Sequence, residues 1–420
     1  MTQLDDALSV PGLSGAPEAA VELRVVPGWD APALGDVAAA SRLRRVEVLA
    51  WRDLDDPEAG GSEAHAAEIA CRWAAAGIDV TFRTSAVDGA PARVERDGYH
   101  VVRRGGRHAV FPRVAARGAL GGIGRADGLV EIWNGMPFFS PVWARCPRVV
   151  FLHHVHAEMW RMTLRPAALA RVGEAIESRL APPLYRRTQV ITLSDSSRSE
   201  IVEQLGLAKQ RVTVVPPGVD RRFRPGGRRS SDPLVVAVGR LVPVKRLGTL
   251  IDALAVLRRD HPRLRAVIAG EGNERAALAA RIAHHGASEW IELPGRVDDD
   301  TLLALYQRAW LVASASLREG WGMTLTEAAA CGTPAVASRI AGHRDAVTDG
   351  HSGLLFDDER GLVEHLRSVL SDGALRSRLG RGALAEAAYR TWDGAARSTL
   401  EVLAAEADRR RGWRLNATQR

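Results

Sequence analysis

The sequence predicts an α/β protein built from two doubly wound parallel sheets in tandem, the architecture of two Rossmann-like domains. Short apolar stretches typical of buried strands alternate with helical stretches of about 10–15 residues, as parallel sheets require. This alternation occurs in two series. A break with Pro216, Pro217 and Gly218, followed by a polar stretch over residues 224–233, separates them.

The composition is that of a globular protein. The chain has 420 residues, 46% of them hydrophobic and 25% charged, which suits about two or three domains with buried cores. No apolar run reaches the roughly 18 residues that span a bilayer, and residues 1–30 lack a secretory signal pattern. Cys71, Cys146 and Cys331 are too scattered for a disulfide framework or a zinc site. We therefore expect a reduced, cytoplasmic setting.

The net charge of +7 is carried almost entirely by arginine, because Lys209 and Lys245 are the only lysines. A basic surface suits phosphorylated ligands, anionic lipid or nucleic acid. The chain has no zinc-finger spacing, no RRM signature and no basic region of a coiled coil. We therefore expect no nucleic-acid partner.

The first series predicts an N-terminal domain over residues 42–218. Residues 1–41 are rich in Ala, Pro and Gly without a clear period, so we expect a weakly structured leader. Ser62 is expected to cap the first helix and Gly77 to end it. A later helical stretch covers residues 166–187. The expected strands are 45–50, 78–83, 99–102, 129–133, 149–152, 190–193 and 212–215.

The second series predicts a C-terminal domain over residues 219–390. Residues 374–408 are helical in pattern and contain no strand. We assign residues 391–420 to a final helix and a tail. The expected strands are 234–238, 266–269, 290–293, 311–313, 335–337 and 353–356.

A basic loop follows the first strand of the second series. Gly239 and Arg240 come directly after this strand, and Lys245 follows on the same loop. An arginine fork and a lysine point charge on one loop can clamp a diphosphate. The alternative is a solvated basic loop, and the rarity of lysine in this chain shifts the balance towards the clamp.

Two carboxylates separated by glycines form a second candidate site. Glu319 is expected on a loop after a strand, and Glu327 in the first turn of a helix that begins near Thr324. Glycine lets backbone amides approach a ligand, the helix N-terminus attracts phosphate, and carboxylates accept hydrogen bonds from sugar hydroxyls. In the alternative interpretation, Glu327 complements the helix dipole and Glu319 lies in a solvated turn.

Glycines and histidines mark two weaker candidates in the first series. Gly60 and Gly61 precede the first helix and are similar to a short anion-binding loop, the alternative being a flexible connection. His153, His154 and His156 end a strand, where parallel sheets bind ligands. Neighbouring strand residues point to opposite faces, so at most His154 and His156 share one. Substrate contact is preferred over a metal site or a buried structural role.

Acidic and serine-rich stretches are interpreted as helix caps. Asp298 precedes a helical stretch, so we expect it to cap that helix rather than to bind metal. Asp53 and Asp55 form a D-x-D pattern on a ligand-side loop but are a weak metal candidate. Ser194 lacks the G-x-S-x-G context of a nucleophile, so capping is expected there too. No metal site is predicted.

Together these motifs resemble the retaining glycosyltransferases of the GT4-type family (glycosyl transferases group 1), which have the GT-B fold. The resemblance covers roughly residues 44–400. Gly239-Arg240 with Lys245 matches the family's diphosphate-binding pattern, and Glu319 to Glu327 matches its E-x7-E signature. Residues 350–355 match a late glycine-containing turn, and residues 215–220 match the segment that leads into the second domain.

The resemblance implies a nucleotide-diphospho-sugar in the cleft between two domains. Arg240 and Lys245 would hold the diphosphate and stabilise the leaving group. Glu319 would contact hydroxyls of the transferred sugar, and Glu327 would accept from the ribose hydroxyls. Backbone or loop contacts with the donor are implied for Gly60, Gly61, Gly239, Gly295, Arg296, Val297, Gly322, Met323, Thr324 and Leu325.

The resemblance also implies a catalytic histidine after a strand of the first domain. Counted from Pro147, His153 matches the family histidine best, with His154 or His156 as alternatives. The last helix, near Trp392, would cross back to the first domain.

The implied reaction transfers a hexose, with retention, from GDP- or UDP-hexose to a hydroxyl of a glycan, a lipid or a small molecule. Cations would neutralise the leaving diphosphate, so no metal or other cofactor is expected, and Glu319 is not assigned as a nucleophile. The setting implied is bacterial cell-envelope glycan biosynthesis. Alternatives on the same fold are a sugar-phosphate-acceptor or phosphorylase-like enzyme, or a nucleotide-sugar-binding protein without transfer.

Two features depart from this pattern or lie outside it. The family often has Gly-Gly-x-x-Glu where this chain has Ala341 and Asp345 in place of the first Gly and the Glu, which leaves the fit of the sugar pocket there open. Residues 161–187 hold six arginines among apolar residues, and a basic amphipathic segment can lie on anionic lipid. A solvated helix is the alternative. Peripheral contact with the inner face of the membrane is a secondary hypothesis.

Overall fold

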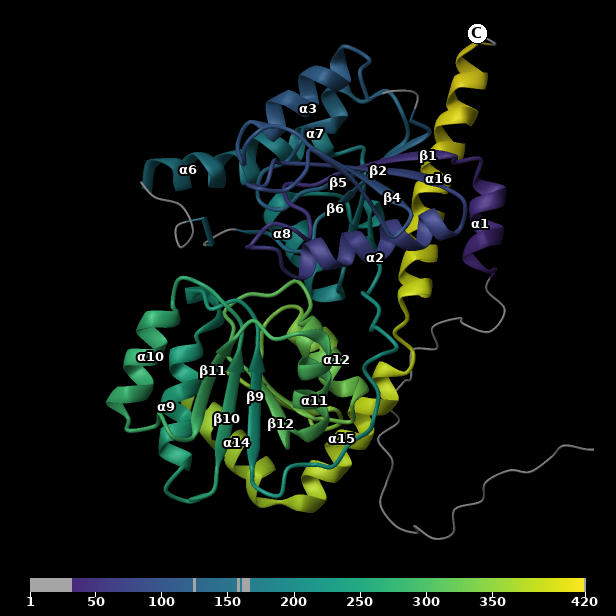
Figure 1. The fold of residues 1–420 in the computed structure, drawn as a ribbon. Helices are drawn as coiled ribbons and strands as arrows, with labels where there is room; N and C mark the ends of the chain where they lie inside the picture. The colour runs from purple at the N-terminus through teal and green to yellow at the C-terminus, as the bar shows by residue number, and fades with distance from the viewer. Residues whose placement is uncertain (1–31, 124–125, 157–158, 161–166, 419–420) are drawn as a thin grey trace, which may run out of the picture. The chain divides into compact units, whose positions relative to one another are not determined.

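Two parallel sheets organise the part of the chain that the structure describes (Figure 1). This computed structural model describes residues 32–123, 126–156, 159–160 and 167–418, with side chains as far as Arg411. From Ala33 onward these residues belong to one compact unit. The first sheet with its helices is termed the first domain, and the second sheet with its helices the second domain. The doubly wound architecture expected from the sequence is confirmed.

The first sheet has eight strands in the order β3-β4-β2-β1-β5-β6-β7-β8. Neighbouring strands are parallel except for β3 and β4, which form an antiparallel hairpin. The strands are β1 (Arg45–Leu49), β2 (Asp79–Thr84), β3 (Arg93–Arg96), β4 (Tyr99–Arg103), β5 (Gly128–Ile132), β6 (Arg148–Phe151), β7 (Gln189–Thr192) and β8 (Val212–Val214). The helices are α1 (Leu34–Ser41), α2 (Gly61–Ala75), α3 (Val110–Ala119), α4 (Ser140–Trp143), α6 (Ala167–Ala175), α7 (Ala181–Tyr185) and α8 (Asp195–Leu205).

The central strands β5 and β6 of the first sheet are largely apolar because both faces of the sheet are covered there. In β6, Val149 and Phe151 enter one core, whereas Val150 enters a second core on the opposite face. β1 and β2 pair in register, with Val48 opposite Phe82. Figure 1 shows α2 on one face of this sheet and α3 and α7 on the other.

The second sheet has six parallel strands in the order β11-β10-β9-β12-β13-β14. In β9, Val235 enters a core with α9 and α14, and Val236 enters a core with α11 and α12 on the other face. The strands are β9 (Leu234–Val238), β10 (Arg265–Ala269), β11 (Ile291–Gly295), β12 (Leu311–Ser314), β13 (Ala335–Ser338) and β14 (Gly353–Phe356). The helices are α9 (Leu247–Leu257), α10 (Arg275–His284), α11 (Asp299–Arg308), α12 (Met323–Ala330), α13 (His343–Ala346), α14 (Glu359–Ser371) and α15 (Gly373–Ala387).

The last helix, α16 (Trp392–Thr418), packs on the first domain although the chain reaches it from the second. The indole N–H of Trp73 donates to the carbonyl of Ala396 at 2.9 Å. Trp392 and Leu400 lie in the same apolar core as Trp73. Within the described ranges, no helix combines the length and the apolar character needed to cross a bilayer.

Two expectations about local structure are wrong. Part of the supposed leader, residues 34–41, forms α1, whose Ala38 is buried in the core shared with α16; residues 1–31 lie outside the described residues. Ser62 is not the cap of α2, which begins at Gly61 and has Gly60 at its N-cap, two residues before Ser62. The carboxylate of Glu63 reaches back to accept the amide of Gly60 at 2.8 Å, which replaces a serine cap.

The expected caps further along the chain are confirmed. Asp298 accepts the amide of Thr301 at 2.7 Å at the start of α11, and Ser194 accepts the amide of Ser197 at 3.0 Å at the start of α8. The strand β3 was not expected from the sequence. It is an edge strand whose exposed and half-buried residues lack an apolar pattern.

Candidate active site

Each sheet has one point where the strand order reverses, and most of the candidate residues lie near these two points. In the second sheet this point lies between β9 and β12, and in the first sheet it lies between β1 and β5. Loops at the carboxyl ends of strands diverge at such a point and leave room for a ligand. The basic loop follows β9 and the loop of Glu319 follows β12, so the topology brings two distant sequence motifs together.

Lys245 and Glu319 form an ion pair at the reversal point of the second sheet. The ammonium of Lys245 donates to Glu319 Oε1, and the hydroxyl of Ser316 donates to the same oxygen at 2.8 Å. Burial opposes the charged carboxylate, but Lys245 and the nearby His343 and Ser316 outweigh it and lower the pKa of Glu319 to about 2. Glu319 is therefore an ionised acceptor of hydrogen bonds at neutral pH.

Gly239 and Arg240 border the same pair. A small cavity of about 10 Å³ is lined by these two residues, by Lys245 and by Ser314 and Ser316. Gly239 has a φ of +152°, which favours glycine, and a β-carbon there would lie 3.6 Å from Lys245 Cε. The backbone at Gly239 therefore lies close to the Lys245 side chain.

The glycine loop of the first domain lies against these residues. A β-carbon on Gly60 would lie 3.6 Å from Arg240 Nε, and one on Gly61 would lie 3.3 Å from Met323 Sδ. The amide of Gly60 already donates to Glu63, so it is engaged within its own domain. The structure thus brings both predicted glycines next to predicted donor-binding residues.

The loop that carries Glu319 is fixed by close backbone approaches. A β-carbon on Gly320 would lie 2.8 Å from the carbonyl oxygen of His153, and one on Gly342 would lie 2.6 Å from the carbonyl oxygen of Glu319. Gly342 also has a φ of +82°, which side chains with a β-carbon rarely adopt. These contacts require glycine at both positions.

The three histidine candidates are neutral, because burial lowers the pKa of each; His153 is buried, and His154 and His156 are half-buried. His153 Nε2 lies 3.4 Å from His65 Nδ1, and burial lowers the pKa of His153 to about 4. Burial, reinforced by His153, lowers the pKa of His154 to about 4 as well. Neither ring nitrogen of His154 has a hydrogen-bond partner among the described residues, and its ring stacks on His156 with centroids 4.8 Å apart. Both ring nitrogens of His154 are therefore left without a described protein partner near Glu319 and Lys245.

Glu327 lies in the second turn of α12, not the first, because that helix begins at Met323. The hydroxyl of Tyr306 donates to Glu327 Oε2 at 2.9 Å. Burial raises the pKa of Glu327 to about 7, and the hydrogen bond from Tyr306 only partly offsets this. Gly322 is the N-cap of α12, and Met323, Thr324 and Leu325 form its first turn.

Arg296 and Val297 lie apart from the ion pair. They follow β11, which is separated from β12 by β10 and β9. Arg296 is exposed and Val297 half-buried. The structure therefore does not bring these two predicted residues to Lys245 and Glu319.

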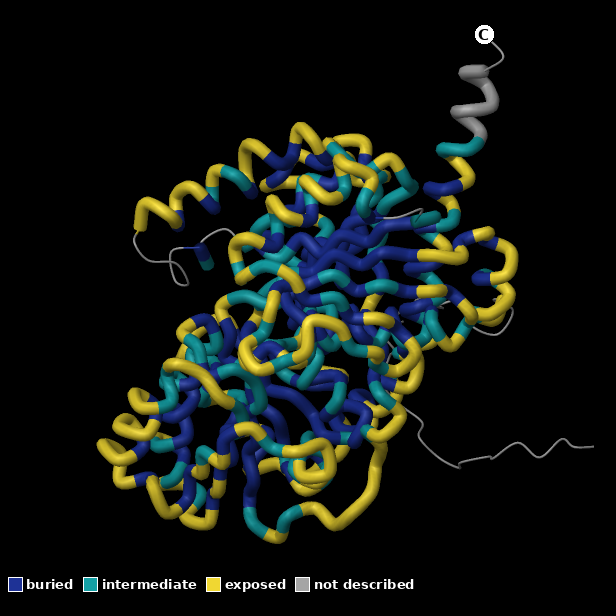
Figure 2. Tube along the Cα trace, turned by 45° about the horizontal axis from the view of Figure 1, so that its top comes forward, coloured by how far each residue is buried: buried dark blue, intermediate teal, exposed yellow. Residues whose placement is uncertain are grey.

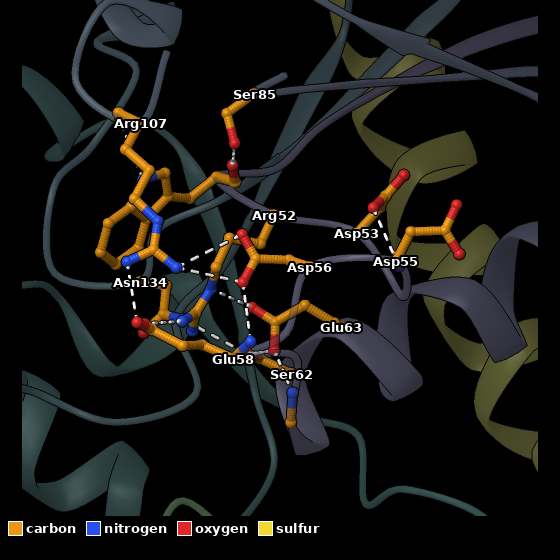
Figure 3. Close-up of polar contacts among 12 residues, drawn as sticks. Arg52, Asp53, Asp55, Asp56, Glu58, Ser62, Glu63, Ser85, Arg107 and Asn134 are labelled. Atoms are coloured by element: carbon orange, nitrogen blue, oxygen red, sulfur yellow. Dashed lines mark hydrogen bonds and ion pairs between the residues drawn. The ribbon is translucent and has the colours of Figure 1, made fainter. Parts of the chain in front are cut away.

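A charged network surrounds the reversal point of the first sheet (Figure 3). The guanidinium of Arg52, buried after β1, donates to Glu58 and Glu63, both at 3.2 Å. Arg107 donates to Glu58 at 2.9 Å and to Asp56 at 3.1 Å. The sequence interpretation did not single out Arg52 or Arg107; the available signal was a run of charged residues directly after a strand.

Further residues at the site were also missed because they meet only in three dimensions. His343 Nδ1 lies 3.0 Å from the carbonyl oxygen of Ser338, and its ring covers Gly322. Tyr306 comes from α11. In the sequence around His343, the preceding Gly342 was the one feature that pointed to a close backbone approach at this position.

The acidic pairs considered for a metal are occupied by arginine. Arg103 bonds to Asp53 at 2.8 Å and also to Asp55, which pairs in addition with Arg96 at 2.5 Å. Across the residues that the structure describes, no group of three or more His, Cys, Asp or Glu side chains is arranged to hold a metal ion. These carboxylates therefore have arginine partners in place of a cation.

A separate cavity of about 460 Å³ lies away from these residues. Its lining includes Asp127, Cys146 and Pro147, which flank the amino ends of β5 and β6, together with Arg410 of α16. Ligands bind at the carboxyl ends in open parallel sheets, so this cavity does not belong to the candidate site.

Comparison with protein families identifies both parts of the chain. The model for glycosyl transferases group 1 matches residues 219–385, and the model for glycosyltransferase family 4 matches residues 59–223. A D-inositol 3-phosphate glycosyltransferase of Streptomyces bingchenggensis is 29% identical over 89% of this chain and 91% of its own. A glycogen synthase of Mycobacterium tuberculosis is 36% identical over 51% of this chain and 53% of its own.

Solved structures share the fold. The sucrose-phosphate synthase of Thermosynechococcus elongatus superposes with a TM-score of 0.74 at 18% identity, over 86% of this chain and 98% of its own. Anabaena HepE, in complex with UDP and glucose, superposes with a TM-score of 0.68 at 20% identity, over 86% of this chain and all of its own. With the motifs, the two sheets and the family matches in agreement, the chain belongs to the GT4-type, group 1 glycosyltransferases and has the GT-B fold.

Proposed function

We propose that this glycosyltransferase moves a hexose, with retention, from a nucleotide-diphospho-sugar to a hydroxyl acceptor. The observation that carries the proposal is the Lys245–Glu319 pair beside Arg240 at the reversal point of the second sheet. It combines cations for a diphosphate with an ionised carboxylate for sugar hydroxyls.

In this proposal Arg240 and Lys245 hold the diphosphate and neutralise the charge that develops as it leaves. The first turn of α12, from Gly322 to Leu325, presents amides at a helix N-terminus that attract phosphate. Glu319 accepts hydrogen bonds from hexose hydroxyls, and Glu327 accepts them from the ribose. Arg296 and Val297 would contact the base, and His153 the sugar.

The bond between the anomeric carbon and the diphosphate oxygen breaks, and the acceptor oxygen bonds to the same face of that carbon. The acceptor proton passes to the departing phosphate. We propose that no metal takes part, because arginine and lysine supply the positive charge and arginine already occupies Asp53 and Asp55. The donor is GDP- or UDP-hexose; UDP is the nucleotide named with Anabaena HepE.

The acceptor is a glycan, a lipid or a small molecule with a free hydroxyl. We place the reaction on the cytoplasmic side, in envelope glycan synthesis. A phosphorylated acceptor is a second candidate, because Glu58 occupies an anion position between two arginines. Glu58 is 52% exposed, and its bond to Arg107 lowers its pKa. A phosphate, which is a stronger anion than a carboxylate, could displace Glu58 from these arginines. The relative from Streptomyces bingchenggensis is named for an inositol phosphate.

The test is a transfer assay with UDP-, GDP- and ADP-hexoses, run with and without EDTA, in which NMR reports the anomeric configuration of the product. Lys245→Ala is the test variant, and Lys209→Ala is the matched control, since Lys209 is the other lysine and lies exposed on a 3-10 turn. We expect transfer with one base, insensitive to EDTA, retained in the Lys209 variant and reduced about 100-fold or more in the Lys245 variant.

Other outcomes separate the alternatives. Donor binding by thermal shift without transfer or hydrolysis would identify a binding protein. Transfer from a hexose 1-phosphate would identify a phosphorylase. The second candidate is tested with two acceptors that differ only by a phosphate, assayed with the wild type and with Arg107→Gln. The wild type should prefer the phosphorylated acceptor, and the variant should lose this preference.

A further inference from the structure

The outer face of the first domain carries an unusual concentration of exposed apolar side chains. Among the described residues, ten large apolar side chains are exposed, and six of them belong to α3, α4, α6, α7 or the segments directly joined to them. α4 contacts both α3 and α7, and the π-helical turn Ile176–Leu180 joins α6 to α7. We term this surface the cationic apolar face; its apolar members are Leu120, Val142, Leu169, Val172, Leu180 and Leu184.

These side chains are not a misplaced part of the core, because the same helices bury their other side. Ala170, Ala181 and Tyr185 are fully buried under the exposed residues. Leu169 and Val172 are three residues apart, and Leu180 and Leu184 are four apart, so each pair shares one side of its helix. Exposed yellow segments run along these helices in Figure 2.

The exposed charged side chains on this face are all cations. Glu177 is buried and accepts the indole N–H of Trp160 at 2.8 Å, and Glu174 is half-buried and has a partner. α3, α4 and α7 contain no carboxylate. The exposed arginines on or next to these helices are Arg113, Arg117, Arg145, Arg171, Arg179, Arg186 and Arg187.

We propose that the cationic apolar face binds the surface of an anionic lipid bilayer. Aliphatic side chains enter the boundary between headgroups and acyl chains, and arginines bury their stems while their guanidinium groups pair with lipid phosphates. A second copy of the chain is a poor occupant, because two such faces would oppose arginine with arginine and supply no exposed carboxylate. Arg161 and Arg165, which the sequence hypothesis included, lie outside the described residues.

The face is linked to the candidate active site by one buried carboxylate. Glu177, on the π-helical turn, accepts the amide of His156 at 3.0 Å, in the loop that carries His153 and His154. A bilayer bound at the face would therefore lie on the element that supports the histidine loop. The proposal concerns the face itself and does not depend on the proposed transfer reaction.

Vesicle co-sedimentation of the full chain tests the proposal. Vesicles of phosphatidylglycerol mixed with phosphatidylcholine are compared with vesicles of phosphatidylcholine alone. The test variants are Leu180→Ser with Leu184→Ser, and Arg179→Glu with Arg186→Glu. The matched controls lie on the second domain: Val256→Ser, on α9, and Arg263→Glu, where both native side chains are exposed.

The wild-type chain is expected to sediment with the anionic vesicles and not with the neutral ones. Each double variant should bind at least about tenfold more weakly, and both controls should bind as the wild type does. A nucleotide-dependent thermal shift and an unchanged circular dichroism spectrum show that a variant is folded. If no protein, including the wild type, shows a thermal shift with nucleotide, the transfer proposal fails. The membrane proposal is then still tested, with the circular dichroism spectrum as the folding control.

Three results would overturn the proposal. The first is the absence of wild-type binding to anionic vesicles. The second is equal binding to neutral vesicles or by the arginine variant. The third is a change of oligomeric state in the leucine variant, measured by light scattering, without a change in vesicle binding, since this would assign the face to self-association.

Discussion

Tyr306 donates its hydroxyl hydrogen to Glu327 across 2.9 Å, so the second carboxylate of the E-x7-E motif has a protein partner before any ligand arrives. This differs from Glu319, whose partner is a full positive charge. The pKa values of the two carboxylates are shifted in opposite directions: burial raises that of Glu327 to about 7 in spite of Tyr306, and Lys245 lowers that of Glu319 to about 2 against the effect of burial. Each shift has a measurable effect on stability or activity.

Glu327→Gln is expected to stabilise the protein increasingly as the pH rises from 5 to 8. The folded pKa of Glu327 lies above its ordinary value of 4.5, so the folded chain holds a proton between about 4.5 and 7 that the unfolded chain has lost. Wild-type stability therefore falls through this window, by at most about 3 kcal/mol. Glutamine cannot ionise and still accepts from Tyr306.

Urea unfolding at several pH values measures this difference. Glu364→Gln, at an exposed position of α14, is the control and should show a flat difference from the wild type. A flat difference for Glu327→Gln as well would show that Glu327 is ionised in the folded protein throughout the range.

Lys245→Met is expected to destabilise the protein by about 2 kcal/mol, because Glu319 would keep a half-buried charge without its partner. The pKa of Glu319 should then rise towards its ordinary range. Adding Glu319→Gln removes the unpaired charge and should recover most of the stability but no transfer activity. A double-mutant cycle of unfolding free energies, with Lys209→Met as control, checks this; additive effects would contradict the pairing.

Gly342→Ala is expected to lower stability by about 3 kcal/mol and to impair transfer. Its β-carbon would meet the carbonyl oxygen of Glu319 at 2.6 Å, and its φ is +82°. Gly61→Ala is the matched comparison, because its β-carbon would meet only the flexible end of Met323, at 3.3 Å. Unfolding and transfer measurements on both should separate them clearly; equal effects would show that the backbone contact at Gly342 relaxes freely.

Asp345→Ala is expected to cost about 1 kcal/mol and to speed hydrogen exchange at the start of α8. The Asp345 carboxylate accepts the amides of Asp195 at 3.2 Å and Ser196 at 3.4 Å, where a negative charge is favourable. Asp357→Ala, at an exposed position, is the control. Unchanged exchange at these two amides would show that water replaces the carboxylate without cost. This contact gives a structural role to a residue that departs from the family pattern.

The motifs near Lys245 and Glu319 were predictable because each is a short local pattern directly after a strand, and parallel topology then brings strand ends together. His343 and Tyr306 were not, since each meets its partner across a separate element of the second domain. α1 escaped prediction because its alanine-rich sequence has no capping side chain, and its stability comes from α16. Serine is a common N-cap residue, which is why Ser62 was predicted as the cap. In the structure, the Glu63 side chain instead accepts the amide of Gly60 at the start of the helix.

The last helix has a consequence for how the chain is made. The core around Trp73 is complete only when Trp392, Ala396 and Leu400 of α16 have been added. During synthesis the first domain therefore leaves the ribosome with an uncovered apolar strip, which stays uncovered until the second domain has been translated. A premature stop codon shortly before residue 392 would leave the residues of both sheets intact. The first domain would nevertheless keep an uncovered apolar strip, and we expect such a protein to need chaperones to stay soluble.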